Sequence, residues 1–294
     1  MPRYNGRIRD EAHGRAIMQV KAVIFDWAGT LVDFGSLAPV QSLQRVFEEA
    51  GVAVPVAEIR ADMGLGKLDH IRQLGMRDEV ARAWAEARGG AAFEDADAVA
   101  LYESYRTVNR RVASERGKLI GGVLKTSQAL RERGILIGTT TGYSRDIMEH
   151  VTAVARAQGF EADTVVCADD VPESRPSPLA VYHVLVTLGV YPASSVIKVD
   201  DTVPGLMEGK AAGCWTVGVS ETGNELGLDE EAFEALPARE RLDLANAAAK
   251  RLTDAGADYV VGSVAEIPAI VDDINERLAD GERPELTEYE PAAA

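Results

Sequence analysis

The fold is decided by one stretch near the start of the chain, Val20-Lys21-Ala22-Val23-Ile24-Phe25-Asp26-Trp27-Ala28-Gly29-Thr30. Its first half is apolar and rich in β-branched residues, which predicts a buried strand of a parallel sheet. Asp26 follows that strand and precedes a glycine turn, at the end where open α/β sheets bind ligands. Asp26 is therefore a candidate nucleophile or metal ligand, although aspartate is also a common N-cap of a following helix.

Short apolar segments alternate with amphipathic helical patterns along much of the chain. This alternation predicts an α/β fold with one doubly wound parallel sheet between layers of helices. Several of the helical patterns end near a glycine that can adopt a left-handed C-cap conformation. The predicted strands are residues 20–25, 135–139, 164–167, 196–199, 215–219 and 259–261, and the predicted helices between them are residues 123–133, 145–158, 179–188 and 205–212.

Helical patterns alone fill the region between residues 37 and 112. This region leaves the predicted sheet just after the Asp26 loop and returns before the second strand, so we expect an inserted cap that covers the site and excludes water. Met18, directly before the first strand, is an alternative start of the chain. The predicted organisation is a polar extension over residues 1–17, an α/β core over 18–36 and 113–281, a helical cap over 37–112 and a flexible tail over 282–294.

The composition limits the classes of ligand. The chain has 294 residues, of which 46% are hydrophobic, so it can bury a large core. With 31 Lys and Arg against 47 Asp and Glu, the net charge of −16 disfavours nucleic acid and anionic membranes, and no run approaches the roughly 18 apolar residues of a membrane span. Cys167 and Cys214 lie in apolar runs, so we expect no disulfide framework or zinc cluster, and a reducing cytoplasm fits.

Four polar motifs follow predicted strands in chain order. A phosphoryl-transfer site needs a nucleophile, hydroxyl and backbone N–H donors, a cation, and carboxylates that hold Mg²⁺, and the four motifs supply each part once. Taken singly, each motif also fits a turn, a surface arginine or a solvated helix start. The motifs are Asp26-Trp27-Ala28-Gly29-Thr30, Thr140-Thr141-Gly142-Tyr143, Ser174-Arg175-Pro176-Ser177-Pro178 and Lys198-Val199-Asp200-Asp201-Thr202.

This set of motifs resembles the haloacid dehalogenase superfamily, in which an aspartate at the first strand forms an aspartyl-phosphate intermediate. Phosphatases of that superfamily usually carry a second aspartate two residues later as the general acid. The chain has Ala28 at that position, and alanine cannot donate a proton. The leaving group must therefore be stable as it departs or be protonated from elsewhere, unless the protein is a non-catalytic binding protein on this fold.

The predicted cap supplies a group that compensates for Ala28, in the stretch Met63-Gly64-Leu65-Gly66-Lys67-Leu68-Asp69-His70. Its two glycines indicate a tight turn, and Lys67 and His70 then share one helical face. A lysine in a covered pocket has a lowered pKa and can form a Schiff base, whose iminium accepts the electrons of a breaking P–C bond. Most lysines are solvated surface residues, so this inference depends on the pairing of Lys67 with Ala28.

Together, the motifs resemble the phosphonoacetaldehyde hydrolases within that superfamily, over about residues 20–278. The resemblance implies hydrolysis of the P–C bond of phosphonoacetaldehyde to acetaldehyde and phosphate in phosphonate degradation, with a homodimer formed through the cap. The alternatives are a phosphate-ester hydrolase or mutase of the same superfamily, or the non-catalytic binding protein. The chain departs from the family pattern at Leu31, where a threonine is usual, and at Gly205, where some members have an aspartate.

The resemblance also assigns roles to individual residues. It implies that Asp26 is the nucleophile and Lys67 the Schiff-base lysine, with His70 as a candidate for moving the protons of Lys67. Tyr143 either packs over the substrate or only finishes its strand. The remaining implied roles are phosphoryl binding by Thr141, Gly142 and Arg175, a flank of Lys67 formed by Met63, and a Mg²⁺ site made of Asp26, the Ala28 carbonyl and Asp201, with Asp200 nearby.

Overall fold

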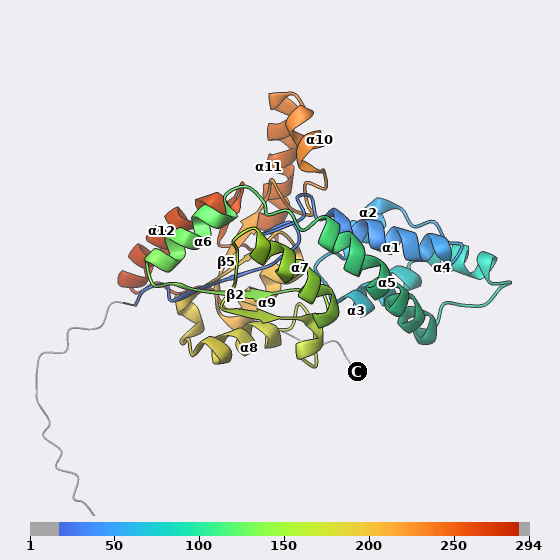
Figure 1. The fold of residues 1–294 in the computed structure, drawn as a ribbon, viewed down its shortest axis with the longest axis horizontal. Coiled ribbons are helices and arrows are strands. Elements are labelled where there is room, and N and C mark those ends of the chain that lie inside the picture. The colour runs from blue at the N-terminus through green and yellow to red at the C-terminus, as the bar shows by residue number, and fades with distance from the viewer. Residues whose placement is uncertain (1–17, 288–294) are drawn as a thin grey trace, which may run out of the picture.

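A six-stranded, fully parallel sheet forms the centre of the protein, with the strand order β3-β2-β1-β4-β5-β6 (Figure 1). The computed structural model describes residues 18–287. The predicted extension and the last seven residues of the predicted tail lie outside the described residues. The strands are β1 (Ala22–Phe25), β2 (Leu136–Thr140), β3 (Thr164–Val166), β4 (Val196–Asp200), β5 (Trp215–Val219) and β6 (Tyr259–Val261).

All six predicted strands are therefore confirmed; β5 and β6 have the predicted bounds, and the ends of the other four are shifted by one or two residues. The predicted strand at residues 164–167 stops one residue early, because the Cys167 N–H donates to the carboxylate of Asp170 and begins a 3₁₀ turn. The predicted helix at residues 205–212 begins earlier, at Val203. Thr202 caps it by accepting a hydrogen bond from the Gly205 N–H, and proline is favourable in a first helical turn.

Helices cover both faces of the sheet, and the side chains of β1 alternate between the two apolar layers. Val23 and Phe25 belong to the layer beneath α6 (Val123–Glu132), α7 (Arg145–Ala157) and α12 (Ile267–Ala279). Ala22 and Ile24 belong to the other layer. That layer also contains side chains of α8 (Leu179–Leu188) and α9 (Val203–Ala212). Burial on both faces explains why β1 is continuously apolar.

The chain order also creates the position of the site. β1 pairs with β2 on one side and with β4 on the other: the chain builds the sheet from β1 outward to β3, then crosses back to β4 and continues in the opposite direction. Ligands of doubly wound sheets bind in the crevice that this change of direction creates. Asp26 stands at that crevice, and its N–H donates to the Val199 carbonyl of the neighbouring strand.

Six helices separate β1 from β2 in the chain, and the first five of them lie together at one end of the molecule (Figure 1, right). The fifth helix continues to Glu115, three residues beyond the predicted limit of the cap. We call residues 37–115 the helical insertion; that it acts as a separate cap domain stays a prediction. The five helices are α1 (Leu37–Glu49), α2 (Val56–Ala61), α3 (Lys67–Met76), α4 (Asp78–Ala87) and α5 (Asp95–Glu115).

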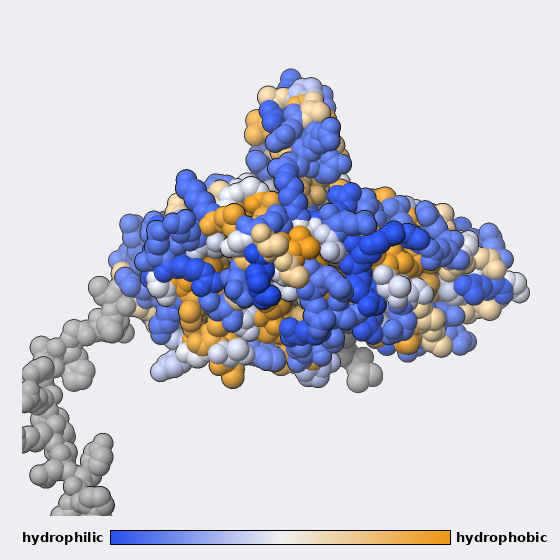
Figure 2. Space-filling view, viewed as in Figure 1, coloured by the Kyte–Doolittle hydropathy of each residue, from blue (hydrophilic) through white to orange (hydrophobic). Residues whose placement is uncertain are grey.

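The remaining helices, α10 (Glu230–Ala235) and α11 (Ala238–Asp254), project from the body of the molecule (Figure 1, top). The face seen in Figure 2 is largely hydrophilic, with scattered apolar side chains. No helix among the described residues is long and apolar enough to cross a membrane. Both cysteines are buried and unpaired.

Candidate active site

The loop after β1 turns back tightly beside Asp26, a residue that is 5% exposed. The Trp27 carbonyl accepts hydrogen bonds from the N–H groups of residues 30, 31 and 32, which turns the chain back at once. Gly29 has φ +90°, and a Cβ atom there would lie 2.3 Å from Oδ2 of Asp201. Only glycine fits this close approach. Leu31, at the position where the sequence comparison expects a threonine, is buried in the core, so apolar packing takes the place of a hydroxyl there.

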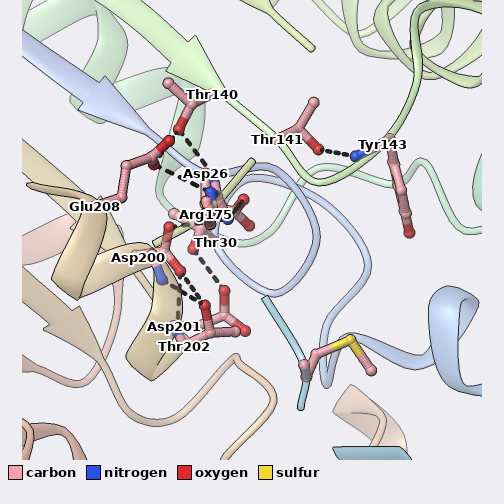
Figure 3. A network of polar contacts seen from close by, with 12 residues as sticks. Asp26, Thr30, Thr140, Thr141, Tyr143, Arg175, Asp200, Asp201, Thr202 and Glu208 are labelled. Carbon is pink, nitrogen blue, oxygen red and sulfur yellow. Dashed lines mark hydrogen bonds and ion pairs between the residues drawn. The ribbon is translucent and has the colours of Figure 1, made fainter. Parts of the chain in front are cut away.

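Arg175 is a buried cation held by four acceptors (Figure 3). Its Nη1 lies 2.8 Å from Oδ1 of Asp26 and 3.3 Å from Oδ2 of Asp200. Its Nη2 donates to the Thr140 hydroxyl at 2.8 Å, and its Nε donates to Oε2 of Glu208 at 3.1 Å. The carboxylates overcome the effect of burial and raise the pKa of Arg175 above its usual range, so the guanidinium is permanently charged.

Three aspartates converge beside Arg175. Oxygen atoms of Asp26, Asp200 and Asp201 lie within 4.8 Å of one another. Burial and the neighbouring Asp200 raise the pKa of Asp26 to about 6, and burial and Asp26 raise the pKa of Asp201 well above its usual value. Burial also acts on Asp200, but Lys198 and Arg175 outweigh it and lower the pKa of that residue.

The donor set of this aspartate group fits a divalent cation. Its carboxylates, together with that of Glu208, outnumber the two buried cations in contact with them, Arg175 and Lys198. Excess buried negative charge is unfavourable without a counter-ion, and oxygen-only donors suit a hard metal ion. Asp26, Asp200 and Asp201 are thus able to hold a metal ion.

The departure from the family pattern at Gly205 has a structural explanation. A Cβ atom at position 205 would lie 2.0 Å from Cγ of Asp200. The Asp200 carboxylate is held there by the Lys198 ammonium at 2.7 Å and by the Thr202 hydroxyl, which donates at 2.7 Å. A side chain at position 205 and this orientation of Asp200 therefore exclude each other.

The residues after β2 form another wall of the site. The Thr141 N–H donates to the Val166 carbonyl, and the Thr141 hydroxyl accepts a hydrogen bond from the Tyr143 N–H at 3.1 Å (Figure 3). A Cβ atom at Gly142 would lie 2.9 Å from the Leu65 carbonyl, so the backbone contacts the helical insertion here. Tyr143 is buried, and its hydroxyl lies near Asn109 but makes no hydrogen bond of good geometry within the described residues.

The turn before α3 brings the helical insertion against the core. Gly64 has φ +101°, and a Cβ atom there would lie 2.3 Å from Oγ1 of Thr202. A Cβ atom at Gly66 would lie 2.3 Å from Oγ of Ser174. The two glycines predicted to form a tight turn thus allow close packing on two core loops. Lys67 follows as the first residue of α3 and is 5% exposed.

Lys67 is buried with few polar partners. Its Nζ contacts the Leu65 carbonyl at 3.3 Å and Sδ of Met63 at 3.7 Å. Burial, aided by the positive charge of Arg175, lowers the pKa of Lys67 to about 8, although Asp26 favours the charged form. The neutral amine, which a nucleophilic lysine requires, is therefore far more populated near neutral pH than in a free lysine, although the charged form still predominates.

His70, one turn further along α3, is fully buried. Neither ring nitrogen makes a hydrogen bond of good geometry within the described residues. Burial and the neighbouring Lys67 lower the pKa of His70 well below its usual value, so the ring is neutral. Since no hydrogen bond joins the two side chains, the proton-transfer role of His70 stays a prediction.

One small pocket between the core and the helical insertion collects most of the predicted site residues. His70, Asp200 and Asp201 do not line it. The predicted residues that do are Asp26, Ala28, Met63, Lys67, Thr141, Gly142, Tyr143 and Arg175.

Other residues of the site carried little or no signal in the sequence. Ser36 and Pro39 line the pocket just after the Asp26 loop, and Ser36 has the unusual φ of +50°. Thr202 and Lys198 belong to the motif that contains Asp200 and Asp201, so their positions could have suggested that they contact the site. Glu208 could not have been found, because only the tertiary fold brings it to Arg175.

The comparisons with known proteins agree with this geometry. The pattern of haloacid dehalogenase-like hydrolases matches residues 20–213. Phosphonoacetaldehyde hydrolase from Paraburkholderia phytofirmans is 47% identical over 265 residues, which cover 90% of this chain and 99% of that protein. The chain belongs to the phosphonoacetaldehyde hydrolase family. The resemblance noted in the sequence is thereby confirmed.

Two further relatives support membership of the phosphonoacetaldehyde hydrolase family. The enzyme of that name from Hahella chejuensis is 41% identical and covers 91% of both chains. The crystal structure of a phosphonoacetaldehyde hydrolase-like protein from Oleispira antarctica superimposes with a TM-score of 0.89 at 41% identity, covering 93% of this chain and 99% of that one. The predicted α/β fold is confirmed by this match and by the parallel sheet.

Proposed function

We propose that this protein hydrolyses the P–C bond of phosphonoacetaldehyde to acetaldehyde and phosphate. The observation that carries the proposal is the buried Lys67, with its lowered pKa, in the same pocket as Asp26 and Ala28. The two ends of the substrate fit this arrangement, because a phosphoryl group needs Arg175 and a nucleophile, whereas an aldehyde needs a neutral amine.

In the proposed order, the neutral amine of Lys67 adds to the aldehyde carbonyl and water leaves, which gives an iminium. A carboxylate oxygen of Asp26 then attacks phosphorus in line, and the electrons of the breaking P–C bond move to the iminium nitrogen and form an enamine. The enamine takes a proton on carbon and is hydrolysed to acetaldehyde and free Lys67. Water hydrolyses the aspartyl phosphate and restores Asp26.

This order explains why Ala28 is tolerated. An enamine leaves without needing a proton at the moment of cleavage, whereas an alkoxide would need the general acid that Ala28 cannot provide. Alanine at this position and lysine at position 67 are therefore parts of one mechanism.

The other candidate residues bind and orient the substrate in this proposal. Arg175 and the donors at Thr141 and Gly142 contact the phosphoryl oxygens, and Met63 and Tyr143 enclose the aldehyde end. Mg²⁺, when bound by Asp26, Asp200, Asp201 and the Ala28 carbonyl, supplies positive charge against the phosphoryl oxygens.

The setting of the enzyme follows from the sequence and the family resemblance. We infer a homodimer formed through the helical insertion, a cytoplasmic location and no nucleic-acid or membrane partner. The two unpaired cysteines support the cytoplasmic location. The net charge of −16 supports the inference that no nucleic acid or membrane is a partner.

The test is acetaldehyde release from phosphonoacetaldehyde in the presence of Mg²⁺, followed by coupled reduction of the product. We expect turnover that is lost in Asp26→Asn and kept in the surface control Asp254→Asn, with much slower hydrolysis of p-nitrophenyl phosphate. Hydrolysis of the ester at a rate that rivals the phosphonate would instead favour the phosphate-ester hydrolase. Mg²⁺ binding without turnover of either compound would favour the non-catalytic binding protein.

A further inference from the structure

Arg60, on α2 of the helical insertion, is hydrogen-bonded to two loops of the core. Its Nη1 donates to the Gly35 carbonyl at 3.1 Å and to the carbonyl and side-chain Oδ1 of Asn224 at 3.2 and 3.0 Å. Its Nη2 donates to the Gly227 carbonyl at 3.1 Å. Asn224 returns a bond, because its Nδ2 donates to the Arg60 carbonyl at 3.2 Å. Arg60 and Asn224 thus fix each other across the boundary.

The same Asn224 contacts the aspartate group. Its N–H donates to Oδ2 of Asp201 at 2.7 Å, while the Thr30 hydroxyl donates to Oδ1 at 3.1 Å. The loop is pressed closely against this side chain, since a Cβ atom at Gly223 would lie 2.2 Å from Cβ of Asp201. The orientation of the Asp201 carboxylate therefore depends on the position of the loop that Arg60 holds.

Arg60 also contacts the turn that carries Lys67. Its carbonyl accepts a hydrogen bond from the Met63 N–H at 3.1 Å, in addition to the bond from Asn224. Met63 in turn contacts Nζ of Lys67 through its sulfur atom. One residue thus joins the Lys67 side of the pocket to the Asp201 side.

We propose that Arg60 is a positioning residue that couples docking of the helical insertion to the readiness of Asp201 to hold a divalent cation. Without the hydrogen bonds of the Arg60 guanidinium, the loop at residues 223–227 is free to move. Asp201 then loses a fixed N–H donor. Removing a residue that orients a metal ligand in this way commonly weakens metal binding by about 10- to 100-fold. The proposal rests on the proposed function in one respect, the role of Asp201 in metal binding.

Arg77 provides a matched control. It also lies in the helical insertion, and its guanidinium donates hydrogen bonds to two carboxylates. These side-chain partners in the described part of the chain, Glu58 and Asp62, both belong to the insertion. Arg77→Ala should therefore destabilise the insertion without reaching Asp201. Arg60→Lys keeps the charge of Arg60 but cannot form its planar fork.

The experiment measures Mg²⁺ binding by titration calorimetry without substrate, together with hydrogen exchange of the amides at residues 223–227. We expect Arg60→Ala and Arg60→Lys to weaken Mg²⁺ binding about tenfold and to speed exchange at Asn224, with Arg77→Ala unchanged in both. Mg²⁺ affinity within twofold of the unaltered protein in Arg60→Ala, equal weakening in Arg77→Ala, or no Mg²⁺ binding by the unaltered protein would overturn the proposal. Failure of the proposed function looks different, since the unaltered protein would then bind Mg²⁺ but release no acetaldehyde.

Discussion

The two walls of the pocket satisfy their polar groups in opposite ways. On the core wall, Arg175 contacts four acceptors, and behind this wall Asp201 accepts hydrogen bonds from two donors. On the wall of the helical insertion, the Lys67 amine contacts one carbonyl oxygen and one sulfur atom, and behind that wall His70 makes no well-formed hydrogen bond. The core wall therefore fixes charges in place, whereas the insertion wall keeps an amine poorly solvated and reactive.

This difference follows from what each wall must do in the proposed reaction. Stabilising charge on phosphorus requires donors that are already oriented, because reorienting them would raise the barrier. Forming an imine requires a lysine that loses its proton near neutral pH, and burial without an anionic partner in contact achieves this. Each prediction below alters one wall and leaves the other in place.

The largest effect is expected from Lys67→Arg. The guanidinium keeps the positive charge but cannot lose its proton or form a Schiff base. We expect acetaldehyde release to fall at least about 10⁴-fold, as for removal of a covalent catalytic group. Coupled assay of the purified variant measures this, with the surface change Lys250→Arg as control. Activity within tenfold of the unaltered protein would mean that the two walls are not chemically different.

Arg175→Lys tests the core wall. An ammonium on a shorter stem cannot reach Asp26, Thr140 and Glu208 together, so the phosphoryl end loses an oriented donor. We expect kcat/KM to fall about 10²- to 10³-fold, the range for loss of one oriented donor to the transition state. The control is Arg145→Lys, on a half-exposed arginine outside the pocket. Equal, small losses in both variants would contradict the account of the core wall.

Lys67→Met should make the protein more stable near pH 7. The buried amine has a pKa of about 8 against 10.5 for a free lysine, so protonating it in the folded state costs about 3 kcal/mol. Between these two pH values the unfolded chain binds more protons, so the unaltered protein gains stability as pH rises. The advantage of the variant in urea unfolding should therefore be about 3 kcal/mol at pH 7 and shrink from pH 8 to 10.5. The exposed control Lys250→Met should show no such trend.

Gly205→Ala should have the smallest effect. Its Cβ would lie 2.0 Å from the Asp200 carboxylate, which must turn away from Lys198 and Arg175. Overpacking of this kind costs about 1–3 kcal/mol, and we expect kcat/KM to fall about tenfold. Gly121→Ala, where a Cβ atom meets nothing within 4 Å, is the control. Unchanged activity in Gly205→Ala would show that the orientation of Asp200 does not matter.

The sequence predicted the sheet and most of the pocket because those features are local. An apolar strand followed by Asp26, and a glycine turn followed by Lys67, are each visible within a few residues. Parallel strands then bring their carboxyl ends to one edge, which makes neighbours of the motifs. The element bounds were less accurate, since single hydrogen bonds such as that of Thr202 set them.

What the sequence could not predict are contacts between distant residues with no motif of their own. Arg60 is one arginine among the many charged residues of the insertion. Only the tertiary fold places its Nη1 3.0 Å from Oδ1 of Asn224. Glu208 has the local appearance of a solvated helix residue, yet it is fully buried beside Arg175. Residues of this kind are found only from the structure, because their roles depend on which distant residues they are buried against.

The most direct test of the central claim is to trap the Schiff base. The protein is incubated with phosphonoacetaldehyde and reduced with borohydride, and its peptides are analysed by mass spectrometry. The account predicts a stable two-carbon adduct on Lys67, absent in Lys67→Arg and absent without the aldehyde. Turnover of the substrate with no adduct on Lys67, or with the adduct on another lysine, would contradict it.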